Sequence, residues 1–359
     1  MQPTLPLTHR AALEELLATH HDFNNAFVPR IHGAPTALEF LQHVRRNQPV
    51  VFSGAIDHWV AMQDWSAAYL RTKMGDKPVD IAQTPSGNAD SVVEFEGKKY
   101  FVRPQTTSEP FSAFMDYLQS SPPPTAPPRI IKYAQSRLYL FPPSSIHKLT
   151  IRIEDNNLYK EYAPLIPDLP PSIPFADAAF SALPDAVNIW IGNDDSISAL
   201  HKDNYENLYC QILGRKKFVL ISPLESICVR EETLPVATYR ETVGGGLEIV
   251  RDEGEEVHCW PTVDPDIESG MGNTWWARCR PLTVDLDRGD MLFLPALWYH
   301  KVSQEVGEEG ICCAVNYWYD MDYGGVFYSS INFVRMCAGL IEQEDGRGRG
   351  KDDNSGEGN

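Results

Sequence analysis

The stretch "SALHKDNYENLYCQILGRKKFVLISP", residues 198–223, has a histidine and an aspartate at its head, followed by two short apolar runs, and a lysine at the start of the second run. The runs are rich in β-branched and aromatic residues and are separated by the turn "LGRK", which predicts two β-strands. His201 and Asp203 lie two positions apart, so on a strand they share one face and point at one location. The stretch therefore predicts a β-rich fold with a functional site on it.

The same strand pattern continues through the second half of the chain. Short strands are expected at 186–192, 205–213, 216–222, 283–287, 290–295 and 310–320. At least six short strands with few helices favour a sandwich or a barrel. We expect a barrel core over about 186–320 inside one domain that spans 35–335.

The first third of the chain mixes helical and strand patterns. Helices are expected at 9–24, 36–47, 65–75 and 110–119, with strands at 48–56, 79–85 and 92–104 and a proline-rich loop at 120–129. We therefore expect an N-terminal helical segment, 1–34, and a mixed α/β region before the barrel. The last segment, 343–359, has almost no apolar residues and is expected to be disordered.

Composition restricts the classes of partner. The 31 basic and 49 acidic residues give a formal charge of −18, which repels nucleic acid and attracts a basic protein segment. No apolar run is long enough to span a bilayer, and the first residues lack a secretory pattern, so we expect a cytoplasmic and/or nuclear protein. The seven cysteines form no CxxC pair, which predicts reduced thiols.

A third metal ligand has to come from a distant strand. Of the ten histidines, His300 alone follows a turn-strand pattern, "RGDMLFLPALWYHKV", in which Pro295 ends one strand and the histidine opens the next. Two histidines and a carboxylate form the facial triad of non-haem iron(II) proteins. The alternative is that the HxD pattern marks an exposed strand end and has no role in metal binding.

Lys216 poses a burial problem. It shares its strand parity with Phe218 and Leu220, so the predicted strand places a cation on an apolar face. Desolvating an ammonium is costly, and an inward lysine requires an anion such as a bound dicarboxylate. The alternative is a lysine at a hairpin tip with its amine in water.

Together these residues resemble the jumonji-C, cupin-like family of 2-oxoglutarate oxygenases. The resemblance rests on His201, Asp203, Asn207, Lys216, the "GD" turn at 289–290, His300, and "AVNYWYD" with Asn316 and Trp318. It extends over most of the chain, and "LHKDNYENLYC", "LPALWYHKV" and "AVNYWYDMDY" are similar to the protein lysyl hydroxylases of the family. The resemblance implies a mainly β double-stranded β-helix (jelly-roll) with flanking helices, and Fe(II) bound by His201, Asp203 and His300.

The resemblance also assigns roles around the metal. Lys216 is expected to pair with the far carboxylate of 2-oxoglutarate, with help from Tyr133 and Ser198. Further cavity residues are Asn207 and Asn316 on the cofactor side and Trp318, Asp320 and Asp322 on the substrate side. The alternatives are ladder or turn asparagines, core packing of the tryptophan, and aspartates that only cap a strand.

One segment departs from the family pattern. After Tyr133, residues of about 137–152 look inserted, and we interpret them as a lineage-specific loop or a retained intron in the gene model. Ser198 stands where a threonine would donate equally well.

The function implied is iron(II)- and 2-oxoglutarate-dependent hydroxylation of a lysine side chain in a basic, lysine-bearing segment of a protein substrate. The alternatives are a lysine demethylase, an endopeptidase of the jumonji type, and a cupin that binds without catalysis. The apolar C-terminal helix expected at 328–343 either covers the barrel or pairs with a second copy in a homodimer.

Overall fold

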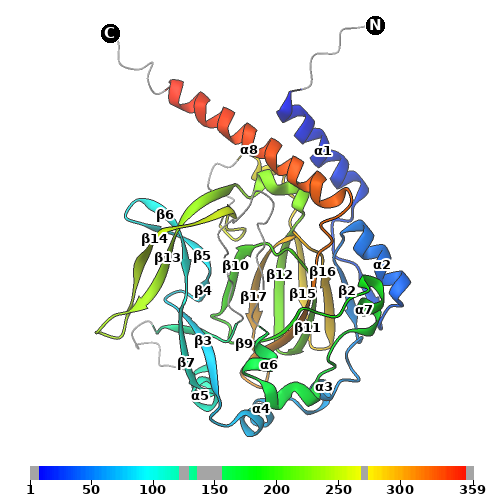
Figure 1. The fold of residues 1–359 in the computed structure, drawn as a ribbon, viewed down its shortest axis with the longest axis vertical. Helices are drawn as coiled ribbons and strands as arrows, with labels where there is room; N and C mark the ends of the chain where they lie inside the picture. The colour runs from blue at the N-terminus through cyan, green and yellow to red at the C-terminus, as the bar shows by residue number, and fades with distance from the viewer. Residues whose placement is uncertain (1–7, 121–128, 136–155, 268–273, 353–359) are drawn as a thin grey trace.

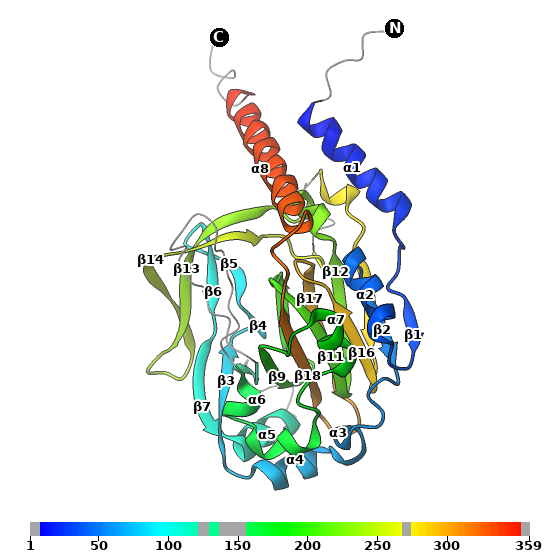
Figure 2. The same ribbon diagram turned by 45° about the vertical axis from the view of Figure 1, so that its right-hand side comes forward.

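A computed structural model describes residues 8–120, 129–135, 156–267 and 274–352. Two antiparallel-rich sheets face each other and form a jelly-roll barrel (Figures 1 and 2). The six-stranded sheet runs in the order β1 (Arg30–His32), β2 (Val50–Ser53), β16 (Asp290–Leu294), β11 (Tyr205–Leu213), β18 (Cys312–Asp320) and β9 (Ala186–Gly192). The five-stranded sheet runs in the order β15 (Leu282–Leu286), β12 (Arg215–Ile221), β17 (Tyr299–Glu305), β10 (Ile197–His201) and β4 (Asn88–Ala89).

The barrel interior is formed by side chains from both sheets. Tyr209 of β11 and Leu292 of β16 pack with Phe218 of β12 and Val302 of β17 in one buried cluster. Alternation along each strand supplies these inward side chains. The barrel expected from the short strand runs is confirmed, and it forms the core of a mainly β fold with flanking helices.

Helices cover the outer face of the six-stranded sheet. They are α2 (Ala37–Arg46), α3 (Val60–Asp64), α4 (Ala67–Met74), α5 (Phe111–Gln119), α6 (Asn157–Lys160), the 3-10 helix η1 (Ala163–Asp168) and α7 (Pro174–Phe180). Helix α2 begins with a capping box between Thr36 and Glu39 and ends at Asn47, which has a left-handed backbone. Its Phe40 is fully buried and packs edge-on against Phe293 of the sheet. The helices predicted at 36–47, 65–75 and 110–119 therefore pack into the core behind the barrel.

Two smaller sheets lie beside the barrel. One contains β14 (Leu247–Pro261), β13 (Glu231–Glu241), β6 (Lys98–Arg103) and β5 (Ser91–Phe95); the other contains β7 (Gln105–Pro110), β3 (Pro78–Thr84) and β8 (Ile131–Tyr133). The long β13–β14 hairpin was not expected from the sequence. Much of β14 is exposed and charged, so the alternating apolar signal that identifies a half-buried strand is weak there.

The first and last helices lie together above one end of the barrel (Figure 2). Helix α1 (His9–Phe23) and helix α8 (Phe327–Asp352) pack against the 3-10 helix η2 (Pro223–Cys228), while η4 (Trp276–Arg278) follows nearby. Helix α8 ends at Asp352, inside the segment 343–359 for which disorder was expected.

Several expectations lie outside the described residues. The suspected insertion at 137–152 is one, most of the proline-rich loop at 120–129 is another, and the end of the expected tail, 353–359, is the third. In the described part of the chain, no helix is both long enough and apolar enough to cross a membrane.

Candidate metal and cosubstrate site

Two histidines meet where neighbouring strands pair. His201 is the last residue of β10, His300 is the second residue of β17, and the antiparallel ladder sets them directly opposite each other. Their ring centroids are 4.1 Å apart. A side-chain pair placed by sheet register is held with little freedom, because each strand is fixed by its neighbours.

Asp203 joins the pair from a loop. Because β10 ends at His201, the expectation that both residues lie on one strand is wrong, and Asp203 follows in the connection to β11. The backbone N–H of Leu297 donates to the Asp203 carbonyl at 2.8 Å and fixes that connection. The Asp203 Oδ2 atom lies 3.6 Å from His201 Nε2 and 3.5 Å from His300 Nε2. The predicted convergence of the three side chains is confirmed.

The ring orientation of both histidines suits metal binding. His201 Nδ1 lies 2.7 Å from the Ala199 carbonyl oxygen, and His300 Nδ1 lies 3.0 Å from the Trp298 carbonyl oxygen. A carbonyl oxygen only accepts, so each Nδ1 carries a proton, and each Nε2 is the ring atom that faces Asp203 and is left to bind a metal. Backbone contacts of this kind fix the tautomer of metal-ligating histidines.

Burial shifts the pKa values of the side chains in this cluster. Burial, helped by the nearby His201, lowers the pKa of His300 well below its usual range, so the ring is neutral. Burial also raises the pKa of Asp203, although His201 and Lys202 oppose that shift. The two imidazole rings and a buried carboxylate, with their ligand atoms within 4.8 Å of one another, fit a divalent iron ion.

Lys216 lies on β12 and is buried, with 1% of its surface exposed. Its ammonium donates to the Tyr133 hydroxyl at 2.8 Å and lies 5.7 Å from the centre of the Tyr209 ring. Among the described residues no carboxylate forms an ion pair with it. The solvated hairpin lysine is therefore ruled out, and the buried ammonium fits the carboxylate of an anionic ligand.

Tyr133 reaches Lys216 from a short strand that several contacts hold in place. In β8, Tyr133 pairs with Ala82 of β3, and the next residue, Ala134, forms a bridge with Ile191 of β9. Burial raises the pKa of the Tyr133 phenol, while Lys216 and a hydrogen bond with Ser198 oppose the shift. The expected group of Lys216, Tyr133 and Ser198 is thus brought together.

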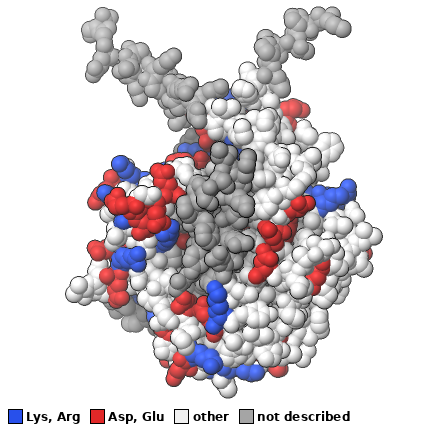
Figure 3. Space-filling view, in the orientation of Figure 1, with Lys and Arg blue, Asp and Glu red and all other residues white. Residues whose placement is uncertain are grey.

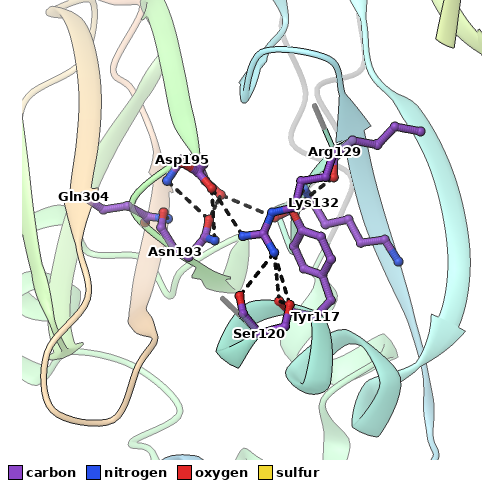
Figure 4. Close-up of polar contacts among 9 residues, drawn as sticks. Tyr117, Ser120, Arg129, Lys132, Asn193, Asp195 and Gln304 are labelled. Carbon is purple, nitrogen blue, oxygen red and sulfur yellow. Dashed lines mark hydrogen bonds and ion pairs between the residues drawn. The ribbon is translucent and has the colours of Figure 1, made fainter. Parts of the chain in front are cut away.

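Arg129 holds the segment before β8 in place (Figure 4). Its guanidinium donates to the carbonyl oxygens of Tyr117 and Ser120 at the end of α5, and to Asp195 in the β9–β10 turn at 3.4 Å. Gln304 of β17 donates to the Asn193 carbonyl of the same turn at 2.8 Å. These contacts fix the entry to the strand that carries Tyr133.

A small cavity lies next to the histidine pair. It is lined by Trp190, Ser198, His201, Asn207, Tyr209, Phe218, His300, Val302, Asn316 and Trp318. Trp190 Nε1 donates to Asn316 Oδ1 at 2.9 Å, and Asn316 Nδ2 donates to Asn207 Oδ1 at 3.2 Å. Trp318 Nε1 is buried, and no described residue accepts a hydrogen bond from it. A buried donor left unpaired in a cavity wall is consistent with a ligand contact.

The predicted substrate-side aspartates lie at the end of β18. Asp320 is its last residue and is paired with Tyr205, two residues from Asp203 in sequence. Asp322 is exposed, and its Oδ1 accepts from the backbone N–H of Gly324 at 2.7 Å. Their role in substrate binding remains a prediction, and Asp322 already serves a local turn.

Sequence reasoning missed Trp190 and Asp90. Trp190 has no motif around it, although its strand parity with Asn188 on β9 could have placed it on the inner face. Asp90 has a positive φ of 55° at the junction of β4 and β5, where aspartate is better tolerated than most residues. Its Oδ2 accepts from Gln135 at 3.1 Å, and its charge interacts with His201.

A jelly-roll with this triad defines the cupin class of metalloproteins, and comparison with known proteins gives the family. A family model described as a cupin-like domain matches residues 35–325. The chain is 34% identical to the bifunctional peptidase and (3S)-lysyl hydroxylase JMJD7 of Homo sapiens, over 82% of this chain and 85% of that protein. It is 32% identical to the JmjC domain-containing protein E of Dictyostelium discoideum, with 84% of both chains covered. It is also 32% identical to the lysine-specific demethylase JMJ32 of Arabidopsis thaliana, with 86% of both covered.

The chain therefore belongs to the cupin-like jumonji-C family of iron(II)- and 2-oxoglutarate-dependent oxygenases. Its metal site is formed by His201, Asp203 and His300. Iron with 2-oxoglutarate supplies oxidative chemistry at a C–H bond when bound. The protein itself would bind the iron ion and the 2-oxoglutarate anion, exclude water and position a substrate side chain.

Replacing Asp203 tests the metal site. Asp203→Ala removes the one anionic ligand, so we expect iron-dependent turnover of 2-oxoglutarate to be lost. The midpoint of thermal unfolding of the metal-free protein should stay the same or rise, because a buried carboxylate without a cation is removed. Turnover by mass spectrometry and unfolding by circular dichroism check both parts; full turnover by the variant would disprove the triad.

Replacing Lys216 tests the anion site. Lys216→Met keeps the aliphatic volume and removes the ammonium, which is worth about 1.5–3 kcal/mol when paired with a buried anion. We expect the dissociation constant for 2-oxoglutarate to rise about ten- to a hundredfold, while iron affinity changes little. Calorimetric titration measures both constants. Tyr133→Phe, which keeps the cation, serves as the control and should have a smaller effect.

Proposed function

We propose that the protein hydroxylates the side chain of an unmethylated lysine in a protein substrate. The observation that carries the proposal is an intact iron site in a chain that is 34% identical, over most of its length, to a protein named as a lysyl hydroxylase. The same name includes a peptidase, and another relative is named as a lysine demethylase. These activities are the competing candidates.

Surface charge supports a lysine-bearing substrate. The formal charge of the chain is −18, and acidic side chains gather over the β13–β14 hairpin on the left of Figure 3. Glu253, Glu255 and Glu256 are exposed there. Such a field raises the encounter rate with a basic segment, although the same charge also serves solubility.

Carboxylates near the cavity offer partners for a lysine ammonium. Besides the ligand Asp203, Asp90 is a carboxylate whose charge interacts with the metal ligand His201, and burial raises the pKa of Asp90 to about 6. Asp320 is the last residue of β18, the strand that carries Trp318, and Asp322 follows it. These three carboxylates are the candidate partners for the ammonium of a substrate lysine.

The modified residue can be found without knowing the substrate. The iron-loaded protein is incubated with 2-oxoglutarate and a cell extract, and tryptic peptides are searched for one added oxygen on lysine. We expect such peptides with the wild type and none with Asp203→Ala. Synthetic versions of a positive peptide should react with an unmethylated lysine and poorly with arginine in its place. Loss of methyl groups from methyl-lysine, or cleavage of the peptide, would favour the competing activities.

Neutral replacements separate the candidate ammonium partners. We expect Asp320→Asn combined with Asp322→Asn to raise the Michaelis constant for a lysyl peptide, without changing the affinity for 2-oxoglutarate. The effect should shrink as salt increases, because exposed charges are screened over about 8–10 Å at ordinary ionic strength. Asp90→Asn is the variant to compare with this double variant, because asparagine has the same shape as aspartate and also tolerates the positive φ at this position. An unchanged Michaelis constant in the double variant would assign both rim aspartates to turn formation alone.

A further inference from the structure

The residues next to the metal ligands share one hydrogen-bond acceptor. Lys202, between His201 and Asp203, donates its ammonium to Glu231 Oε1, and the hydroxyl of Tyr299, the residue before His300, donates to the same oxygen at 2.8 Å. A single carboxylate at the start of β13 therefore contacts both segments that carry the ligands.

The other oxygen of this carboxylate reaches the C-terminal helix. Glu231 Oε2 accepts from Nε of Arg335 on α8 at 2.8 Å. The ammonium of Lys202 also donates to the Cys259 carbonyl at 2.8 Å and lies 5.1 Å from the centre of the Tyr299 ring. The Glu231 contacts thus connect β13, the two ligand-bearing segments and α8.

Burial makes these contacts strong and specific. The side chain of Glu231 is 11% exposed, and those of Lys202 and Arg335 are 12% and 15% exposed. Hydrogen bonds between charged groups gain strength where water is excluded, and their geometry is correspondingly strict. Burial raises the pKa of Glu231, but Lys202 and Arg335 outweigh that effect and lower it overall, so the group is a carboxylate at neutral pH.

We propose that Glu231 is a positioning residue of the iron centre. It fixes the backbone on both sides of the site through Lys202 and Tyr299, and its bond to Arg335 makes that arrangement depend on α8. Glu231 touches neither the metal nor the cavity; it acts through the residues next to the ligands. The proposal rests on the metal site and does not depend on which substrate is hydroxylated.

A purely stabilising role is the competing explanation, and metal affinity separates the two. Replacing a group that orients metal ligands from outside the coordination sphere typically lowers metal affinity or activity about 10- to 100-fold. A group that only stabilises the fold lowers the unfolding temperature and leaves the affinity of the folded protein for metal unchanged.

The principal variant is Glu231→Gln, which keeps the side-chain size and removes the charge. Co(II) is titrated anaerobically into the purified full-length protein, and its visible absorption reports both affinity and coordination geometry. We expect Co(II) binding at least about tenfold weaker than in the wild type, with an altered absorption band. The affinity of the metal-saturated variant for 2-oxoglutarate, measured separately, should change less, because Lys216 is untouched.

Glu225→Gln is the matched control. Glu225 is also buried, with 1% of its surface exposed, and it accepts from the backbone N–H of Arg280 at 2.7 Å while lying 2.9 Å from His21 Nε2. It lies in η2, and no described contact joins it to a residue adjacent to a metal ligand. We expect a lower unfolding temperature with near wild-type Co(II) affinity and absorption.

Tyr299→Phe keeps the test decisive if Glu231→Gln does not fold. It removes one hydrogen bond and leaves both cations paired with the carboxylate, so we expect a smaller loss of Co(II) affinity in the same direction. Folded Glu231→Gln or Tyr299→Phe protein with wild-type Co(II) affinity and absorption would overturn the proposal. An equal loss of Co(II) affinity in Glu225→Gln would overturn it as well.

Discussion

The position of β17 between β10 and β12 is the constraint on which the site depends. Pairing with β10 sets His300 opposite His201, and pairing with β12 sets Gln304 opposite Lys216. Gln304 lies four positions after His300, so the metal ligand and the anion site lie about 13 Å apart along one strand at backbone level. The register of a single strand thus sets the span available to a dicarboxylate that contacts both.

The distribution of charge follows from the same arrangement. Lys216 lies inside the barrel with a phenol as its partner, whereas Lys202 lies outside the cavity with Glu231. The difference matters because a buried cation that already has a carboxylate partner gains little from an anionic ligand. Of these two lysines, Lys216 is the one without a carboxylate partner among the described residues, and it is therefore the one suited to bind cosubstrate.

Much of the barrel could be predicted from the sequence because its strands are short, apolar and separated by turns. The "KKFVLIS" run shows the strength of this signal, since parity put Lys216 on the face of Phe218 and Leu220, although it left open whether the amine was buried or in water. The prediction was less accurate at Asp203, because the strand ends at His201 and a loop then brings the carboxylate back toward the two rings. Spacing shows that two residues are near each other but does not show where a strand stops.

Other parts of the site depend on long-range contacts that no local pattern contains. Asp90 is brought beside the site because β4 pairs with β10, and those strands are more than a hundred residues apart in sequence. Glu231 begins a hairpin whose charged second strand hides the strand signal. The roles of such residues come from their partners, and the partners become known only once the sheets are assembled.

The Glu231 contacts also give α8 a role beyond covering apolar surface. Ile331, Val334 and Ala338 of this helix are buried, whereas Phe333 and Met336 are exposed. The apolar contacts hold α8 against η2 and α1, but they do not determine its rotation as strictly as a charged hydrogen bond does, since apolar packing lacks direction. Arg335 supplies that direction by ending on the carboxylate that also holds Lys202 and Tyr299. A shift of α8 that moved Arg335 would break its hydrogen bond with Glu231. The Glu231 carboxylate could then change its contacts with Lys202 and Tyr299, the residues next to the iron ligands.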